Sequence, residues 1–204
     1  MVYTDEAILL IREQMKQTEK KSHSDEVIEE ELKQSIYDKE VKIFRLPVKF
    51  TDMELLEGRI TMRLPEDFTP RTQEEIARAF FLKDKPQYVY CNPYLDFALT
   101  MNWTGHQVSR DTLFEAARDV ESVLDRVGPK TQFLGRHQLK REEGNLAICQ
   151  LLANALDGVT YMAMFFASVE GRLLMGSLSF DQKLSKRLAP LADEIVKSLR
   201  IREE

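Results

Sequence analysis

The chain has 204 residues, of which 43% are hydrophobic and 31% are charged, a composition typical of soluble globular proteins. It excludes a disorder-dominated chain, and the length suits one domain of roughly 150 residues with an appendage. Residues 1–57 carry 14 acidic and 9 basic side chains and residues 58–204 carry 20 of each, so the net charge of −5 lies in the N-terminal quarter. The neutral remainder offers no basic face for nucleic acid.

Two short helices are predicted within residues 1–40, which we treat as an acidic N-terminal extension. The first has a narrow apolar stripe of Ile8, Ile11 and Met15, and the second, near residues 25–37, includes Ile36. Isolated helices of this length are barely stable in water, so we expect them to dock on the domain, on a partner protein or on a second copy of the chain. Ile8, Ile11 and Met15 are therefore the candidate partner-docking residues.

Export and membrane signals are missing from this N-terminal region. Its longest apolar stretch, residues 7–11, is too short for a signal-peptide core or a membrane span, and acidic residues precede it. We therefore expect a cytoplasmic protein that binds no membrane. Cys91 and Cys149 are too few for a disulfide framework, and their apolar strand surroundings indicate reduced core thiols.

The domain is predicted to span residues 41–204 and to open with extended segments. Residues 41–48 are typical of a strand or connector, and residues 60–64 alternate between apolar and polar side chains as in a strand covered on one face. A capping box of Thr72 and Glu75 then begins a short helix, in which we expect Ile76, Ala79 and Phe80 to point inward.

A hairpin follows, with predicted strands at residues 87–91 and 96–103. Alternation divides its second strand into an apolar side and a polar side. The apolar side carries Phe97, Leu99, Met101 and Trp103. The polar side carries Asp96, Thr100 and Asn102.

The helix over residues 112–127 is the clearest element, because apolar residues recur at steps of four and three before Gly128 and Pro129 end it. Four strands joined by short turns are predicted next, at residues 131–139, 146–153, 159–168 and 172–180. The third is apolar on both sides, so both sheet faces must be covered there, one by this helix and the other by a closing helix within residues 184–199. Pro190 predicts a kink or a separate first turn in that closing helix.

This order of elements predicts an α+β protein, an α/β/α sandwich on a central, mainly antiparallel sheet of about six or seven strands, with a helical N-terminal extension. The segments ITMRLPEDF (60–68), PQYVY (86–90) and ALDGVTYMAMFF (155–166) resemble the PsbP-like fold family, most closely its bacterial cytoplasmic branch of unknown function. The similarity covers residues 54–201. Known members are an extrinsic photosystem II subunit and a Ran-binding nuclear import factor, so the resemblance implies a binding module and names no partner.

The sequence contains no motif for catalysis, a metal or a cofactor, and we expect none of these. His23, His106 and His137 are scattered without companion ligands, and Ser177 and Ser179 lie in a strand without the second glycine of a nucleophile elbow. Met162, Met164 and Met175 could form a soft binding surface, but methionine at alternating strand positions is more often core filler.

Aromatic residues near the hairpin give the predicted binding surface, because aromatic side chains with a polar tip are enriched at interfaces. Its members are Tyr88, Tyr90, Tyr94, Trp103 and His106. The competing interpretation, which we favour, is that Trp103 closes the core.

Three functions stay open at this point. We favour a non-catalytic cytoplasmic protein-interaction or adaptor module, whose partner is another protein or, through the N-terminal helices, a second copy in a homodimer. The alternative is a small-molecule carrier with a pocket between the sheet and a covering helix. An enzyme is third, because no acid, base and nucleophile set is recognisable.

Overall fold

The computed structural model describes residues 31, 33–80, 85–92, 97–127, 131–155 and 158–202. Its large sheet has seven antiparallel strands: β5 (Thr69–Pro70), β6 (Tyr88–Asn92), β7 (Phe97–Gln107), β8 (Gln132–Leu139), β9 (Leu146–Ala155), β10 (Gly158–Val169) and β11 (Arg172–Asp181). They lie in the order β5-β6-β7-β11-β10-β9-β8, so the hairpin β6-β7 joins the later strands through β11.

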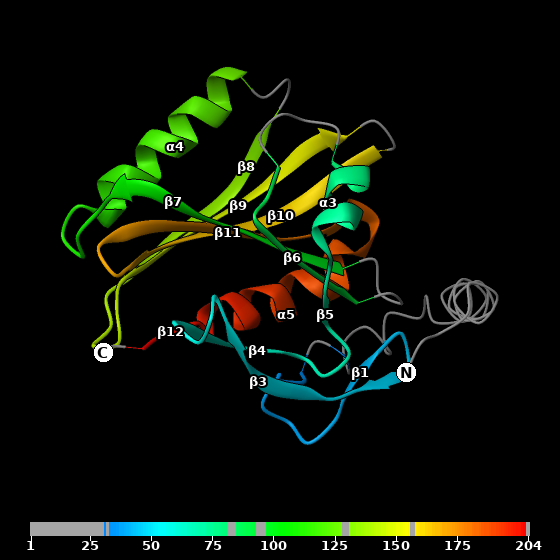
Figure 1. Ribbon diagram of the computed structural model, residues 1–204. Helices are drawn as coiled ribbons and strands as arrows, with labels where there is room; N and C mark the ends of the chain where they lie inside the picture. The colour runs from blue at the N-terminus through cyan, green and yellow to red at the C-terminus, as the bar shows by residue number, and fades with distance from the viewer. Residues whose placement is uncertain are drawn as a thin grey trace.

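Two helices lie on opposite faces of this sheet (Figure 1). Helix α4 (Leu113–Val127) covers one face, and α5 (Ser185–Lys197) covers the other. The predicted α+β fold, with helices on both faces of a central antiparallel sheet, is therefore confirmed. None of the helices in the described part of the chain has the length and apolarity that a membrane crossing requires.

A smaller sheet lies beyond α5, which is therefore held between two sheets (Figure 1). It contains β3 (Phe50–Leu55), β4 (Ile60–Pro65) and β12 (Arg200–Ile201), in the order β12-β4-β3. The sequence predicted β4 but not β3, because β3 buries only its two end residues and has no alternating pattern. The predicted connector at residues 41–48 is a hairpin of β1 (Val41–Ile43) and β2 (Leu46–Val48).

The local helix signals are largely confirmed. In α3 (Gln73–Ala79), the Thr72 hydroxyl accepts from the Glu75 N–H while the Glu75 carboxylate accepts from the Thr72 N–H, so the predicted capping box is present. Ile76 is buried, but Ala79 is exposed, so the expectation that Ala79 points inward is wrong. A separate turn, η1 (Gln182–Leu184), precedes α5, but contrary to the prediction Pro190 does not separate it from the helix, because Pro190 lies within α5 itself.

The main core fills the space between the large sheet and α5. Nine side chains of β7, β10 and β11 that point into this core are buried: Phe97, Leu99, Met101, Tyr161, Ala163, Phe165, Leu174, Leu178 and Phe180. We call these nine residues the closed face. Trp103, further along the same side of β7, packs against this core but is only partly buried. Gly176 lies opposite Phe165 on the neighbouring strand, and a Cβ built there would be 2.2 Å from the Phe165 ring, so only glycine fits.

The segment before β1 is fastened to this core. Ser35 Oγ and the Ile36 N–H donate to the Glu194 carboxylate of α5, at 3.0 and 2.8 Å, and Ile36 is fully buried. Residues 33–40 form turns and bends, so the helix expected through residue 37 ends earlier. Residues 8, 11 and 15 of the candidate docking helix lie outside the described residues. The boundary proposed between residues 40 and 41 stays a prediction.

Candidate functional site

The opposite face of β7, β10 and β11 is only partly covered. Helix α4 places Leu113 and Ala117 on a second, smaller core that includes Phe166 and Leu173. Beside this core, eight side chains on the same face of the sheet are only partly buried: Ala98, Thr100, Asn102, Thr160, Met162, Met164, Met175 and Ser179. We call these eight residues the open face.

Strand pairing arranges small polar side chains across the floor of the open face. Ser179 lies opposite Ala98 on one side and opposite Met162 on the other. One row further, Ser177 lies opposite Thr100, and their hydroxyl oxygens are 3.0 Å apart, a hydrogen bond that either can donate. Four small side chains therefore form this part of the surface, and three of them carry hydroxyl groups: Ala98, Thr100, Ser177 and Ser179.

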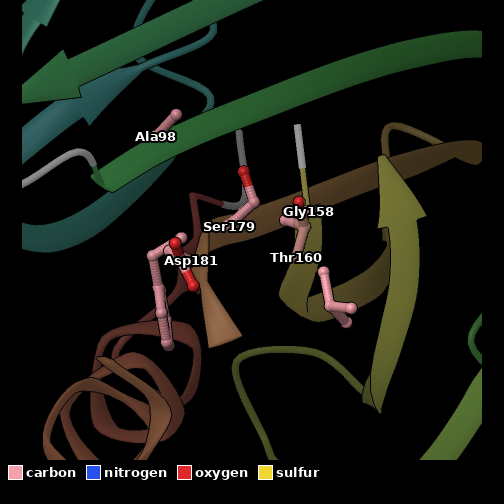
Figure 2. Close-up of a pocket in the computed structure, with 7 residues that line it drawn as sticks. Ala98, Gly158, Thr160, Ser179 and Asp181 are labelled. Atoms are coloured by element: carbon pink, nitrogen blue, oxygen red, sulfur yellow. The ribbon is translucent and has the colours of Figure 1, made fainter. Parts of the chain in front are cut away.

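A hollow of about 380 Å³ lies at one end of the open face, where β10 begins and β11 ends (Figure 2). It is lined by Ala98, Gly158, Val159, Thr160, Ser179, Phe180 and Asp181. The register places the Ala98, Thr160, Ser179 and Asp181 side chains on one face, because Thr160 is opposite Asp181 and Ser179 is opposite Ala98. The small Ala98 side chain leaves this space unfilled. The polar side-chain atoms that line the hollow are all oxygens, from Thr160, Ser179 and Asp181.

The Asp181 carboxylate is held in place by the start of η1. One carboxylate oxygen accepts from the Lys183 N–H at 2.9 Å and caps this turn. The other oxygen lies 3.9 Å from Lys183 Nζ, and the Lys183 side chain is 88% exposed. The hydrogen bond to the first oxygen thus fixes the direction of the second one. The Lys183 ammonium group lies too far from that second oxygen for a hydrogen bond.

The covered part of the same face contains a thiol that cannot serve as a nucleophile at neutral pH. Cys149 is fully buried beneath α4, close to the carboxylate of Glu121, which pairs with Arg136. Burial chiefly, with a smaller contribution from Glu121, raises the pKa of the Cys149 thiol to about 12. The thiol therefore stays protonated, in keeping with the predicted reduced core cysteine.

Two members of the predicted aromatic surface lie toward the closed face. Tyr88 and Tyr90 on β6 pair with Met101 and Leu99, and both pack against the main core while remaining partly exposed. Burial, followed by the nearby Tyr88, raises the pKa of the Tyr90 hydroxyl. Tyr94 lies outside the described residues.

Several contacts hold the Trp103 side chain on β7. The guanidinium carbons of Arg59 and Arg172 lie 4.7 and 3.9 Å from the centre of its ring, and its indole N–H donates to the Val169 carbonyl at 3.2 Å. The ring packs against the main core and remains partly exposed. His106 follows three residues later and is exposed. The use of these aromatic residues as a binding surface stays a prediction.

The hydroxyl floor was missed from the sequence, where Ser177 and Ser179 were weighed only as nucleophiles. The signal was present as alternation: Thr100 and Asn102 share one side of β7, and Ser177 and Ser179 share one side of β11. The sequence alone could not show that these two polar sets meet, because β7 and β11 are far apart in the chain and become neighbours only in the folded sheet. Among the residues that the structure describes, no three His, Cys, Asp or Glu side chains are placed to hold a metal ion.

The fold defines a class of α/β/α sandwich that is known from solved structures. The solution structure of cyanobacterial PsbP (CyanoP) from Synechocystis aligns with a TM-score of 0.55 at 11% identity, over 75% of this chain and 92% of that chain. The present chain therefore has the PsbP-like fold, as its sequence predicted.

Two further solved structures are similar over a comparable share of the chain. The Ran-binding protein Mog1p of Saccharomyces cerevisiae aligns at 13% identity over 76% of this chain and 96% of its own, with a TM-score of 0.43. LpqN of Mycobacterium tuberculosis, involved in cell envelope biogenesis, aligns at 12% identity over 76% of this chain and 92% of its own, also at 0.43. No protein-family model and no curated protein sequence matches the chain.

Proposed function

We propose that the chain is a non-catalytic protein-interaction module and that the open face is its docking surface. The observation that carries the proposal is the contrast across one set of strands: the closed face is fully buried, whereas the open face leaves eight side chains partly exposed. Three of these are methionines, whose flexible, polarisable side chains suit surfaces that adapt to a partner. A partner segment laid beside α4 would complete the cover that α5 supplies on the closed face.

The N-terminal extension is the second part of this proposal. Its Ile8, Ile11 and Met15 stripe would dock on the partner or on a second copy of the chain, and the complex would form in the cytoplasm. The open face and the extension are separable, because residues 33–44 already anchor the chain on the side of α5 away from the open face.

Affinity capture from the host's lysate with surface variants tests the open face. The double variant Met164→Gln and Met175→Gln keeps side-chain size but adds polar groups to the open face, and Leu46→Gln on the exposed β2 is the matched control. We expect wild type and Leu46→Gln to capture the same protein and the double variant to lose it. Because both methionines pack against the second core, we expect a small fall in the thermal unfolding midpoint of the double variant, and capture is compared at a temperature well below it. Equal capture by all three would overturn the open face as the docking surface.

The hollow beside Asp181 favours a second candidate function, a small-molecule carrier. Its volume of about 380 Å³ is within the usual range for ligand sites. Native mass spectrometry of the protein purified from its host checks this candidate. A bound compound that is lost in Ala98→Leu, which fills the hollow, would favour the carrier over the interaction module.

A further inference from the structure

We propose that the hollow lined by Thr160, Ser179 and Asp181 binds a primary ammonium group, and that a lysine side chain of the protein partner supplies it. This inference rests on the proposed function, since it names the group by which the partner is recognised. It gives the open face one negatively charged group, the Asp181 carboxylate, that would bind a lysine of the partner.

The acceptors of the hollow converge because of the strand register. Thr160 and Asp181 are directly opposite each other, and Ser179 lies two residues before Asp181 on the same face. Directly opposite side chains have Cβ atoms about 5 Å apart, and diagonal ones roughly 7–8 Å. A nitrogen placed between such oxygens can lie at the N–H···O distance of about 2.9 Å from more than one of them.

An ammonium group matches these acceptors better than a guanidinium does. It carries three donors that point in different directions, whereas arginine presents a planar fork suited to a carboxylate with both oxygens free. In Asp181 one oxygen already accepts from the Lys183 N–H, so a bidentate arginine would have to share that oxygen. The remaining carboxylate oxygen and the Ser179 and Thr160 hydroxyls form a three-point acceptor set.

The exposure of the residues that line the hollow favours a side chain of a larger partner over a free amine. Gly158 at its rim is exposed, and the Asp181 side chain is 49% exposed. Small-molecule sites usually bury about 70–90% of their ligand. A lysine presented by a docked protein needs no such enclosure, because the partner's own surface covers the mouth.

Lys183 acts as an internal competitor for the same carboxylate oxygen. Its Nζ is 3.9 Å from that oxygen, beyond hydrogen-bond distance, and its side chain is 88% exposed. An exposed pair of this kind contributes little and exchanges readily. Removal of the Lys183 charge should therefore improve binding at the hollow, which a purely structural role of Asp181 would not predict.

The test is an NMR titration of the full-length protein with Nα-acetyl-lysine N-methylamide, with the norleucine analogue as the uncharged control. We expect the lysine probe to shift the amide signals of Gly158, Thr160, Ser179 and Asp181 and the norleucine probe to leave them unchanged. Asp181→Asn keeps a good N-cap residue for η1 and should lower the affinity for the lysine probe by about tenfold or more. Ala98→Leu should abolish binding by filling the hollow, and Lys183→Ala should tighten it.

Shifts of equal size with the norleucine probe, or undiminished affinity in Asp181→Asn, would overturn the ammonium site. A free diamine, 1,4-diaminobutane, that binds far more tightly than the lysine probe would overturn the partner lysine as its source. Lysate capture keeps this inference apart from the proposed function. Capture that persists in Asp181→Asn overturns the lysine anchor and leaves the interaction module standing, whereas probe binding without any captured protein supports the ammonium site and overturns the module.

Discussion

The two faces of β7, β10 and β11 are made by alternate residues of the same strands, yet they have opposite character. The closed face carries aromatic and aliphatic side chains, including the stacked pair Tyr161 and Phe180, and all nine of its residues are buried. The open face carries hydroxyl groups, one amide, alanine and methionine, and all eight of its side chains are partly exposed. The fold itself covers the closed face, and the open face is the surface that we propose a partner covers.

The difference comes from what lies behind each helix. On the closed side, α5 is itself backed by the small sheet and by the segment around Ile36, so three layers of chain exclude water. On the open side, α4 contacts β9 and β10, and among the described residues no second sheet lies behind it (Figure 1). Stability should therefore depend on the closed face, and binding should depend on the open one.

Adjacent residues of β10 provide the largest test of this difference. Phe165 is fully buried on the closed face, and Met164 is partly exposed on the open face. We expect Phe165→Ala to lower the free energy of unfolding by about 3–5 kcal/mol, because it leaves a cavity in the core. Met164→Ala should cost about 1 kcal/mol or less, since water already reaches that side chain. Urea unfolding measures both, and comparable losses would contradict the division between the faces.

Gly176 gives a test of close packing within the closed face. Gly176→Ala would place a Cβ 2.2 Å from the Phe165 ring, so the ring must move. We expect a loss of about 1–3 kcal/mol in unfolding free energy. In the double variant with Phe165→Leu, part of this loss should be recovered, because the smaller side chain leaves room for the added methyl group. Additive losses in this pair would show that the strain lies elsewhere.

The elements that the sequence predicted correctly depend on local signals. The Thr72 and Glu75 capping box, the alternation from Phe97 to Trp103 and the long periodic stripe of α4 each lie within one segment. Strand β3 was missed because only its two end residues are buried, and its pairing with β4 provides the remaining contacts.

The open face could not be predicted, because its character depends on which strands become neighbours. Ala98 and Ser179 are 81 positions apart and meet only through the pairing of β7 with β11. The attachment of Ile36 is similar, since its amide is satisfied by Glu194, far along the chain. The sequence also predicted that a helix covers each face of the large sheet. It did not indicate that α4 would cover only part of its face.

Two cysteines lie on the α4 side of the large sheet, one in the part that α4 covers and one in the part that it leaves uncovered. Cys149 lies buried beneath α4, and its thiol has a pKa raised to about 12 from an ordinary 9.0. Cys91 is opposite Ala98 of the open face and is partly exposed. The folded state holds the Cys149 proton more strongly than the unfolded state does. Its stabilising contribution is thus complete below about pH 9 and is lost as the pH rises toward 12.

We expect the unfolding free energy of the wild type to fall between pH 9 and 10, and Cys149→Ala to reduce that fall by about 1 kcal/mol. Cys91→Ala is the matched control and should leave most of the fall in place. Iodoacetamide at pH 8 should label Cys91 in the native protein well before Cys149, which peptide mass spectrometry can follow. Equal labelling would mean that α4 does not protect the sheet beneath it.

The hydroxyl pair of Thr100 and Ser177 gives the smallest and most local test. Thr100→Val removes the partner of Ser177, which is only 5% exposed and cannot readily turn to water, so we expect a loss of about 1 kcal/mol. Ser177→Ala should cost about 0.5 kcal/mol, because the partly exposed Thr100 hydroxyl can bind water instead. The double variant should cost less than the sum, since it leaves no buried hydroxyl without a partner. If Ser177→Ala proved the costlier change, water would not reach Thr100, and the floor of the open face would be closed to a partner as well.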